Sequence, residues 1–509
     1  MWRLKLFCLL CTEFVLGDKI EHVIALIMEN RPYDHFFGFG NFPEADGLKG
    51  NESNPVDPYD SSKGNISVLD GNASYVCSSG PSQAFSVFCA DFFGPENNVS
   101  CAGPDYPESQ PRNGWVYENT AEAMYPFWPA QIPVKMALAS EFALMDRYYA
   151  SFPGPSTPNH LFIQSGTSAG CTTTGATYHC NGSSFPQKTI YQALEEKNYT
   201  WKYYYNDTAW NTFLEWFDTP NGAAGVVDYN HFYAAAESGD LPNFAFILPR
   251  QGTNQTTGEG SNDDHPCHAV NLGERLLKDT YEALRASPAW NKTLFIVTYD
   301  DAGGFYDHVE LVTHGVPKPD NEPSSCPDNT SFTYIGPRLP TMLASPWIPK
   351  GTIVHDPQGT VGTPARPFNT SKFEHSSILK TIEHIFGLEP LTKRDAWAAS
   401  LLPILSLDEP RTDTPLHLPE APSNTEYTGP ATHGCFSDHE LTRRHQRRIR
   451  HLAKHVDGLS EEQINFLLKS ELSEPADAEA WINKKTQQAK QRALSSSAFS
   501  HHHQDTIEL

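Results

Sequence analysis

The sequence is short of basic residues. Only 37 Lys and Arg stand against 61 Asp and Glu in 509 residues, which gives a formal net charge of −24 at pH 7. That excess of acid argues against nucleic-acid partners, because an acidic protein and a polyanion repel each other. The 40 Pro and 34 Gly stay below the level of collagen or a low-complexity chain, so the composition predicts a globular protein.

Long apolar runs and internal repeats are also missing. Outside the N-terminal segment, no stretch approaches the 18 apolar residues of a transmembrane helix. The N-terminal segment has Arg3 and Lys5, then an apolar run over 6–16 and a small Gly17, which predicts a secretory signal peptide over residues 1–17. Glu13 interrupts the run, and a buried first helix is the alternative.

Asn-x-Ser/Thr sequons are more frequent than chance allows. The sequence holds eleven, where its composition would give roughly four. They begin at Asn51, Asn65, Asn72, Asn98, Asn181, Asn198, Asn206, Asn254, Asn291, Asn329 and Asn369. We therefore expect a secreted glycoprotein that carries these loops on its surface.

Cysteines with the CxxC spacing of zinc sites are absent after residue 17, so we expect no thiolate metal site. Eight of the 10 Cys follow the predicted signal peptide. An even number in a secreted chain suggests disulfides, whose pairing does not follow from the sequence.

Short apolar runs alternate with helical patterns along the chain. The runs lie at 22–28, 243–248 and 294–299, and the helical patterns at 189–197, 269–287 and 376–386. Runs of this length suit strands buried on both faces, as in a parallel sheet, and the alternation predicts an α/β sandwich. We expect a catalytic domain over 18–404, with an irregular insertion or lid at 50–120 and a helical extension and tail at 405–509.

Acidic and amide side chains follow two of the three apolar runs. Glu29 and Asn30 end the first, and Asp300 and Asp301 end the third. In open parallel sheets ligands gather at the carboxyl ends of strands, and hard oxygen ligands are those that divalent cations prefer. Each pair alone is equally consistent with a helix cap or a surface turn, but together they favour a metal site.

A Pro/Gly-rich turn at 153–155 precedes Ser156 and Thr157. A hydroxyl at a helix N-terminus is well placed to bind phosphate and to act as a nucleophile, although an ordinary N-cap is the plain alternative. Histidines beside carboxylates occur at His265, His308 and His375, a pattern that suggests acid catalysis or oxyanion binding.

These segments together resemble the phosphoesterase family of bacterial phospholipases C, plant non-specific phospholipases C and a group of acid phosphatases. The similar blocks occur in family order at 29–38, 155–160, 164–168, 264–266, 299–308, 338–340 with 345–347, and 375–379. The resemblance covers about residues 20–400 and implies an alkaline-phosphatase-like three-layer α/β sandwich with a largely parallel sheet.

The resemblance also implies roles for individual residues. It places a divalent metal ion of unknown identity on Glu29, Asn30, Asp300 and Asp301. Ser156 matches the family nucleophile two residues before the Pro-Asn pair. His265 and His308 would contact or protonate the phosphate, and His375 would lie nearby as a further catalytic residue. Three further residues, Thr157, Asn159 and His160, would bind substrate, and Thr157 is also the fallback nucleophile.

The chain departs from the family pattern at several of these positions. The family usually has Arg where this chain has His160, and it often has Asp-Glu where this chain has Asp300-Asp301. Glu374-His375 stands where Asp-His is usual, and residues 90–130 hold no His where members often have one. These differences leave the core reaction in place and bear on substrate preference.

The sequence is consistent with three functions. The first is a secreted phospholipase C-like hydrolase that releases diacylglycerol from a phospholipid, and the second is a secreted acid phosphatase for soluble monoesters. The third is an inert surface-binding glycoprotein. The basic stretch at 443–451 is either a solvated helix or a peripheral membrane contact.

Overall fold

The computed structural model divides into two units, residues 1–433 and 434–509. It describes residues 19–76, 80–95, 107, 109–174, 183–209, 212–252, 260–266, 268–321, 330–423, 453, 457–470, 481 and 485. In the second unit, Ile464 and Leu467 of helix α14 (Glu461–Ser470) pack with Ala453. The predicted signal peptide and the basic stretch at 443–451 lie outside the described residues.

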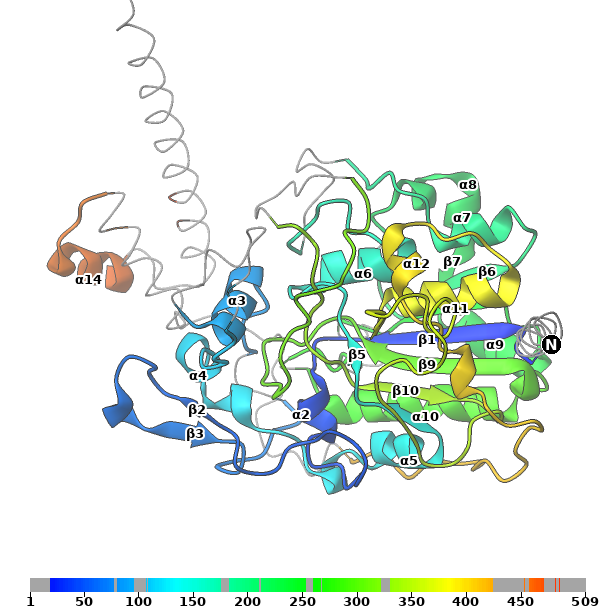
Figure 1. Cartoon of the computed structure of the whole chain (residues 1–509), viewed down its shortest axis with the longest axis horizontal. Coiled ribbons are helices and arrows are strands. Elements are labelled where there is room, and N and C mark those ends of the chain that lie inside the picture. The colour runs from blue at the N-terminus through cyan, green and yellow to red at the C-terminus, as the bar shows by residue number, and fades with distance from the viewer. Residues whose placement is uncertain are drawn as a thin grey trace, which may run out of the picture. The chain divides into compact units, whose positions relative to one another are not determined.

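A mixed sheet forms the centre of the first unit (Figure 1). In the described residues its strand order is β11-β4-β10-β9-β1-β8-β6-β7, and β10 alone runs against the others. The strands are β1 (His22–Met28), β4 (Ala143–Met145), β6 (Trp201–Tyr205), β7 (Val226–Asp228), β8 (Phe244–Leu248), β9 (Thr293–Tyr299), β10 (Thr341–Ala344) and β11 (Thr352–Val354). Short pairs outside this sheet are β2 (Ser53–Pro55) with β3 (Asn65–Ser67), and β5 (Tyr148–Tyr149) with β12 (Phe373–Glu374).

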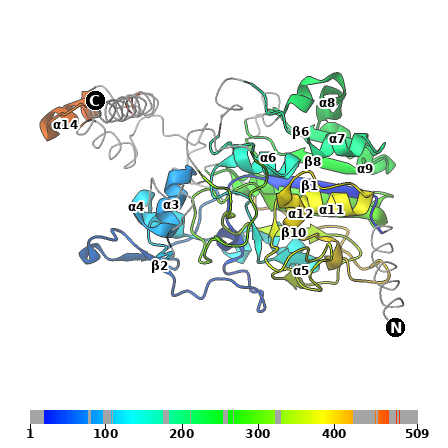
Figure 2. The same cartoon turned by 45° about the horizontal axis from the view of Figure 1, so that its top comes forward.

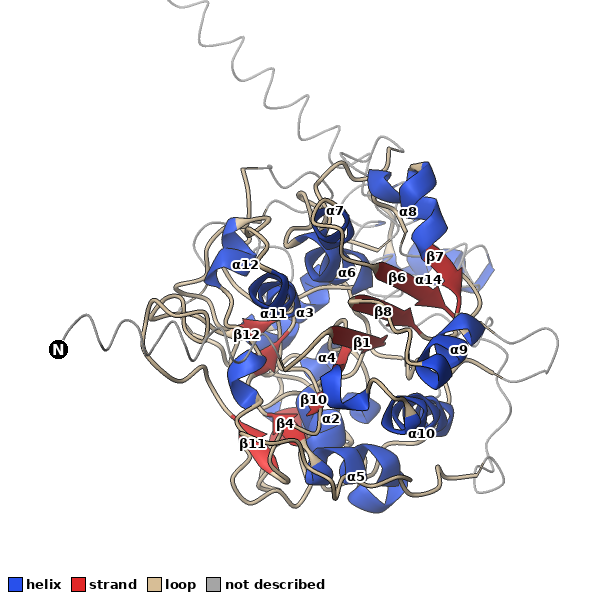
Figure 3. Ribbon diagram, turned by 90° about the vertical axis from the view of Figure 1, so that its right-hand side faces the viewer, coloured by secondary structure: helices blue, strands red, loops and turns tan. Residues whose placement is uncertain are grey.

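The three apolar runs of the sequence are the three central strands β9, β1 and β8. Their side chains are almost entirely buried, because helices cover both faces of the sheet. Figure 3 shows α6, α7 and α11 on one side and α5 and α10 on the other. The prediction of a three-layer α/β sandwich with a largely parallel sheet is therefore confirmed.

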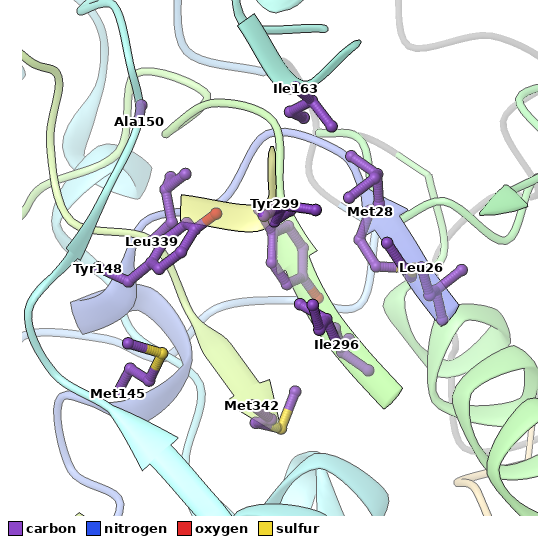
Figure 4. Close-up of a cluster of buried hydrophobic side chains, with 14 of the residues drawn as sticks. Leu26, Met28, Met145, Tyr148, Ala150, Ile163, Ile296, Tyr299, Leu339 and Met342 are labelled. Atoms are coloured by element: carbon purple, nitrogen blue, oxygen red, sulfur yellow. The ribbon is translucent and has the colours of Figure 1, made fainter. Parts of the chain in front are cut away.

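The helices of the first unit are α2 (Tyr33–Phe37), α3 (Phe85–Phe93), α4 (Trp115–Glu118), α5 (Pro133–Glu141), α6 (Ser156–Ser165), α7 (Ile190–Glu195), α8 (Pro220–Gly225), α9 (Asn230–Ser238), α10 (Val270–Ala286), α11 (Ser376–Phe386) and α12 (Lys393–Trp397). The three predicted helices correspond to α7, α10 and α11. Figure 4 shows part of the buried core, to which strands and helices both contribute, among them Met28 of β1, Ile163 of α6 and Tyr299 of β9.

The elements of residues 50–120 gather beyond the carboxyl end of β1, where α2 begins (Figures 1 and 2). Trp115 Nε1 donates to the carbonyl oxygen of Phe305, which fixes α4 on the loop that follows β9. Helix α3 buries most of its side chains in the main core. Leu405 and Leu418, which follow the boundary that we expect at 404/405, belong to the main core of the first unit, and that boundary stays a prediction.

The cysteines and sequons are only partly described. Cys89 is disulfide-bonded, whereas Cys171 is a buried free thiol whose pKa burial raises to about 12. Four sequons, Asn98, Asn181, Asn254 and Asn329, lie outside the described residues. Among the described residues we find no helix whose length and apolar content would let it span a bilayer.

A buried ionic network ties together the loops that follow three central strands. Lys135 Nζ of α5 lies 3.0 Å from Asp264 Oδ2 and 3.1 Å from Glu274 Oε1. The hydroxyl of Tyr299, the last residue of β9, donates to the same Asp264 oxygen, at 2.5 Å. Arg31, three residues after β1, donates its Nε proton to the carbonyl oxygen of Asp264 at 2.8 Å. Asp264 therefore links the loop after β8 to those after β1 and β9.

Asp264 is held in this position by backbone and space as well as by charge. Its φ of 70° lies in the left-handed region, which Asp tolerates better than most residues. Gly273 of α10 leaves room for the carboxylate, since a Cβ at that position would stand 1.9 Å from Asp264 Oδ1.

We predict that Lys135→Met lowers the free energy of unfolding by about 3–5 kcal/mol, because it leaves two buried carboxylates without their cation. Lys350→Met is the matched control: it breaks an exposed pair with Glu141 and should cost about 0–1 kcal/mol. Urea unfolding of the two variants measures the difference. Equal losses for both would contradict the account of the network.

Candidate active site

Two acidic strand ends meet at one edge of the sheet. Strands β1 and β9 pair in parallel register up to Met28 and Tyr299, so the residues that follow emerge side by side. The backbone N–H of Asn30 donates to Asp300 Oδ1 at 3.0 Å, and Glu29, Asn30, Asp300 and Asp301 are at most 1% exposed. The structure therefore brings the four predicted metal ligands together.

Local backbone geometry allows this close approach. Asn30 has a φ of 62°, in the left-handed region that Asn visits more readily than most residues. Gly303 has a φ of 61°, and a Cβ there would stand 2.0 Å from the carbonyl oxygen of Asn30. The N–H of Gly303 donates to Asp301 Oδ1 at 2.7 Å, which orients that carboxylate.

Ser156 is the first residue of α6 and faces the acidic cluster. Its Oγ lies 3.3 Å from Glu29 Oε2, 3.2 Å from Asn30 Oδ1 and 3.3 Å from Asp301 Oδ2. A hydroxyl has one proton, so it donates fully to only one of these three acceptors. The excess of oxygen atoms around Ser156 is the property expected of a cation site.

The Asn30 amide stands between the carboxylates and a histidine. One of its two polar atoms lies 3.0 Å from Glu29 Oε2 and 2.8 Å from Asp300 Oδ1, and the other lies 2.8 Å from His265 Nε2. With the nitrogen toward the carboxylates, the amide donates hydrogen bonds to them. With the oxygen toward them, the amide adds a further acceptor to the carboxylates, as in a cation site.

The charges of the cluster are poorly compensated. Burial and then the neighbouring carboxylates, chiefly Asp300, raise the pKa values of Glu29 and Asp301 well above their ordinary range. In the part of the chain that the structure describes, no Lys or Arg forms an ion pair with Glu29, Asp300 or Asp301. A divalent cation fits this donor set, and when bound there it would acidify the Ser156 hydroxyl and neutralise charge on a phosphoryl group.

Two buried histidines touch the acidic residues directly. His160 Nε2 lies 3.1 Å from Glu29 Oε1 and 3.6 Å from Asp300 Oδ2. His375 Nε2 donates to the carbonyl oxygen of Asp300 at 2.7 Å. Burial lowers the pKa of each imidazole to about 4, so both rings are neutral at physiological pH.

Other predicted site residues have different surroundings. Asn159 accepts from the N–H of Phe152 at 2.9 Å and donates to the carbonyl oxygens of Phe152 and Gly154, so it braces the turn before Ser156. Thr157 is buried, and its hydroxyl makes no hydrogen bond to the acidic cluster within the described residues. Roles for these two in substrate binding stay predictions.

His308 belongs to a neighbouring cluster. Its Nδ1 lies 2.7 Å from Asp34 Oδ2 and its Nε2 lies 3.2 Å from Asp46 Oδ1. Although burial lowers the pKa of His308, the hydrogen bond and charge of Asp34 raise it overall. Arg338 pairs with both Asp34 and Asp307, at 2.7 and 2.9 Å, so these acids already have a cation. Contact of His308 with phosphate stays a prediction.

Sequence reasoning missed Gln83 and Asp263. Gln83 Nε2 lies 3.3 Å from His265 Nε2 and beside the Asn30 amide, and it comes from the irregular insertion, which carries no pattern that could have identified it. The carbonyl oxygen of Asp263 accepts from the N–H of Glu29 at 2.8 Å. His265 was predicted as a site residue, and the two acidic residues before it, Asp263 and Asp264, were the sequence signal that could have identified Asp263.

Comparisons with known proteins identify the family of the chain. The model of the phosphoesterase family matches residues 20–389. Non-specific phospholipase C3 of Arabidopsis thaliana is 37% identical over 422 residues, which cover 80% of this chain and 77% of that protein. Hemolytic phospholipase C of Pseudomonas aeruginosa is 25% identical over 424 residues, which cover 73% of this chain and 53% of that protein.

A solved structure with similarity to the chain is a protein in the alkaline phosphatase superfamily from Vibrio parahaemolyticus. Its TM-score is 0.30 at 13% identity, over 55% of this chain and 63% of that chain. The family match spans most of the sequence and includes every residue of the acidic cluster and Ser156. The chain belongs to the phosphoesterase family and is a phosphoric ester hydrolase.

Proposed function

We propose that this protein is a secreted phospholipase C-like enzyme that cleaves the glycerol–phosphate bond of phospholipids. The observation that carries the proposal is the position of Ser156 Oγ, 3.2–3.3 Å from carboxylate oxygens of Glu29 and Asp301 and from the Asn30 amide. A hydroxyl at a helix N-terminus beside a cation site suits in-line attack on phosphorus. The relatives named phospholipase C support the choice of a phospholipid as substrate.

The proposed reaction has two steps. In the first, Ser156 Oγ releases its proton to solvent and bonds to phosphorus while the bond from phosphorus to the glycerol oxygen breaks. The glycerol oxygen takes a proton from a histidine, and diacylglycerol leaves. In the second, water displaces Ser156 from phosphorus and releases the phosphorylated headgroup. Glu29, Asn30, Asp300 and Asp301 would hold the divalent cation that supports both steps.

Among the histidines, we propose His265 as the donor of the proton that the glycerol oxygen takes. His375 already uses its Nε2 on the backbone of Asp300, which gives it a positioning role. His265 points its Nε2 at the Asn30 amide, next to Ser156, and holds its Nδ1 3.0 Å from the carbonyl oxygen of Pro266. That backbone contact fixes the ring with a proton on Nδ1, so the proton given to the glycerol oxygen would be the second one, on Nε2 of the imidazolium form.

We further propose that the protein enters the secretory pathway as a glycoprotein. Seven of the eleven sequons lie in the described residues, and all seven are accessible. Six are exposed, namely Asn51, Asn65, Asn72, Asn198, Asn291 and Asn369, and Asn206 is half-buried. None of the seven would need to unfold to accept a glycan.

Membership of a hydrolase family weighs against the inert surface-binding hypothesis. The acid phosphatase hypothesis uses the same residues, so an assay of substrate preference has to distinguish it from the phospholipase C hypothesis. Residues 443–451 enter the proposal only as a segment that would contact the surface of a phospholipid membrane.

Ser156→Ala should reduce turnover of phosphatidylcholine by at least about 1,000-fold, because it removes the nucleophile from the reaction. Ser165→Ala is the matched control: it removes a buried hydroxyl from the last residue of the same helix and should keep turnover within about tenfold. Release of diacylglycerol is the measurement. If Ser156→Ala stays active while Thr157→Val is inactive, the nucleophile is the fallback Thr157 instead.

Removal of divalent cations with a chelator should abolish hydrolysis, and one divalent cation added back should restore it, because buried carboxylates need a counter-charge to bind a phosphate. The assay compares phosphatidylcholine with a soluble phosphomonoester. Activity on the monoester alone would make the protein an acid phosphatase. Full activity in the chelator would contradict the proposed cation site.

A further inference from the structure

We propose that His160 is a direct nitrogen ligand of the cation at this site, and that the centre therefore prefers a first-row transition ion such as Zn²⁺ over Mg²⁺ or Ca²⁺. The inference rests on the cation of the proposed function and adds a residue that we first expected to bind substrate. It also concerns a position where the chain departs from the family pattern described above.

The helix places His160 and Ser156 on one face. They are four residues apart on α6, so their side chains lie one turn apart and point the same way. His160 is fully buried, and its Nε2 lies 3.1 Å from Glu29 Oε1. The other oxygen of Glu29 lies 3.3 Å from Ser156 Oγ, so a single carboxylate joins the histidine to the nucleophile.

The spacing of the polar atoms is close to that of neighbouring metal ligands. Ligand atoms about 2.1 Å from one ion stand about 3.0–3.4 Å apart in octahedral and tetrahedral geometry. His160 Nε2 lies 3.1 Å from Glu29 Oε1 and 3.6 Å from Asp300 Oδ2. The Glu29 contact lies within this range, and the Asp300 contact lies slightly beyond it and is too long for a good hydrogen bond from His160.

The charge balance leads to the same conclusion. Glu29, Asp300 and Asp301 are buried together, and the described residues offer them no Lys or Arg ion pair. A protonated His160 would bring at most one positive charge to these carboxylates. A divalent ion brings two, and the imidazole then binds it as a neutral ligand.

The chemistry of the donors sets the preference among cations. Carboxylate and amide oxygens alone suit Mg²⁺ and Ca²⁺, but an imidazole nitrogen suits Zn²⁺ and other transition ions. Because loss of a group that only supports a ligand typically costs 10–100-fold in metal affinity, loss of His160 should lower Zn²⁺ affinity by at least about tenfold. Ca²⁺ affinity should change much less.

Pulsed electron paramagnetic resonance of the Mn²⁺-loaded protein tests the inference. All samples carry alanine in place of His501, His502 and His503, so that imidazoles of the tail contribute no signal. We expect imidazole ¹⁴N modulation in the parent chain and none in His160→Gln, which keeps a side chain able to hydrogen-bond to Glu29. His417→Gln is the matched control, because His417 also contacts a Glu, but at the surface, and it should keep the signal.

The outcomes separate this inference from the proposed function. Bound Mn²⁺ without ¹⁴N modulation, or modulation that survives His160→Gln, would overturn the role of His160 and leave the cation in place. Failure of the parent chain to bind Mn²⁺ or Zn²⁺ at all would overturn both. If His160→Gln does not fold, the double variant His265→Gln/His375→Gln gives the second test: a signal that survives supports His160, and Mn²⁺ that is still bound but gives no signal overturns its role.

Discussion

The burial of like charges at adjacent strand ends is the constraint on which the rest of this site depends. The register of β1 and β9 forces Glu29 and Asp300 to emerge together, and both faces of the sheet are covered, so water cannot solvate them. Such a cluster is stable only with protons or a cation, since buried unpaired charge is costly. The uncompensated negative charge that destabilises the site on its own also favours binding of a cation and, through the cation, of a phosphate.

The surrounding structure holds this cluster in place at some cost. Asn30 and Asp264 adopt left-handed backbone conformations, and Gly303 and Gly273 leave the space that their neighbours need. Lys135 supplies the cation that Asp264 requires, and Asp264 in turn binds Tyr299, the residue before Asp300. Because the site is preorganised in this way, its rearrangement during the reaction costs little free energy.

Local patterns in the sequence were enough to predict the central strands, three helices and the four acidic-cluster residues, because apolar periodicity and strand-end polarity are local properties. Short strands such as β10 and β11 were not predicted, since three or four residues carry too little pattern. The packing of Tyr203 is another example: it is buried in β6 and stacks on Phe246, with ring centroids 4.9 Å apart. The surroundings of His308 and Gln83 depend on long-range packing, which one sequence does not reveal.

The most direct test of the account is to identify the covalent intermediate. The full chain, mixed with phosphatidylcholine and quenched in acid within milliseconds, would be digested and examined by mass spectrometry. The account predicts a phosphocholine group on Ser156, because the bond to glycerol breaks first. A phosphatidyl group on Ser156, an adduct on another residue, or turnover with no adduct under any quench time would contradict it.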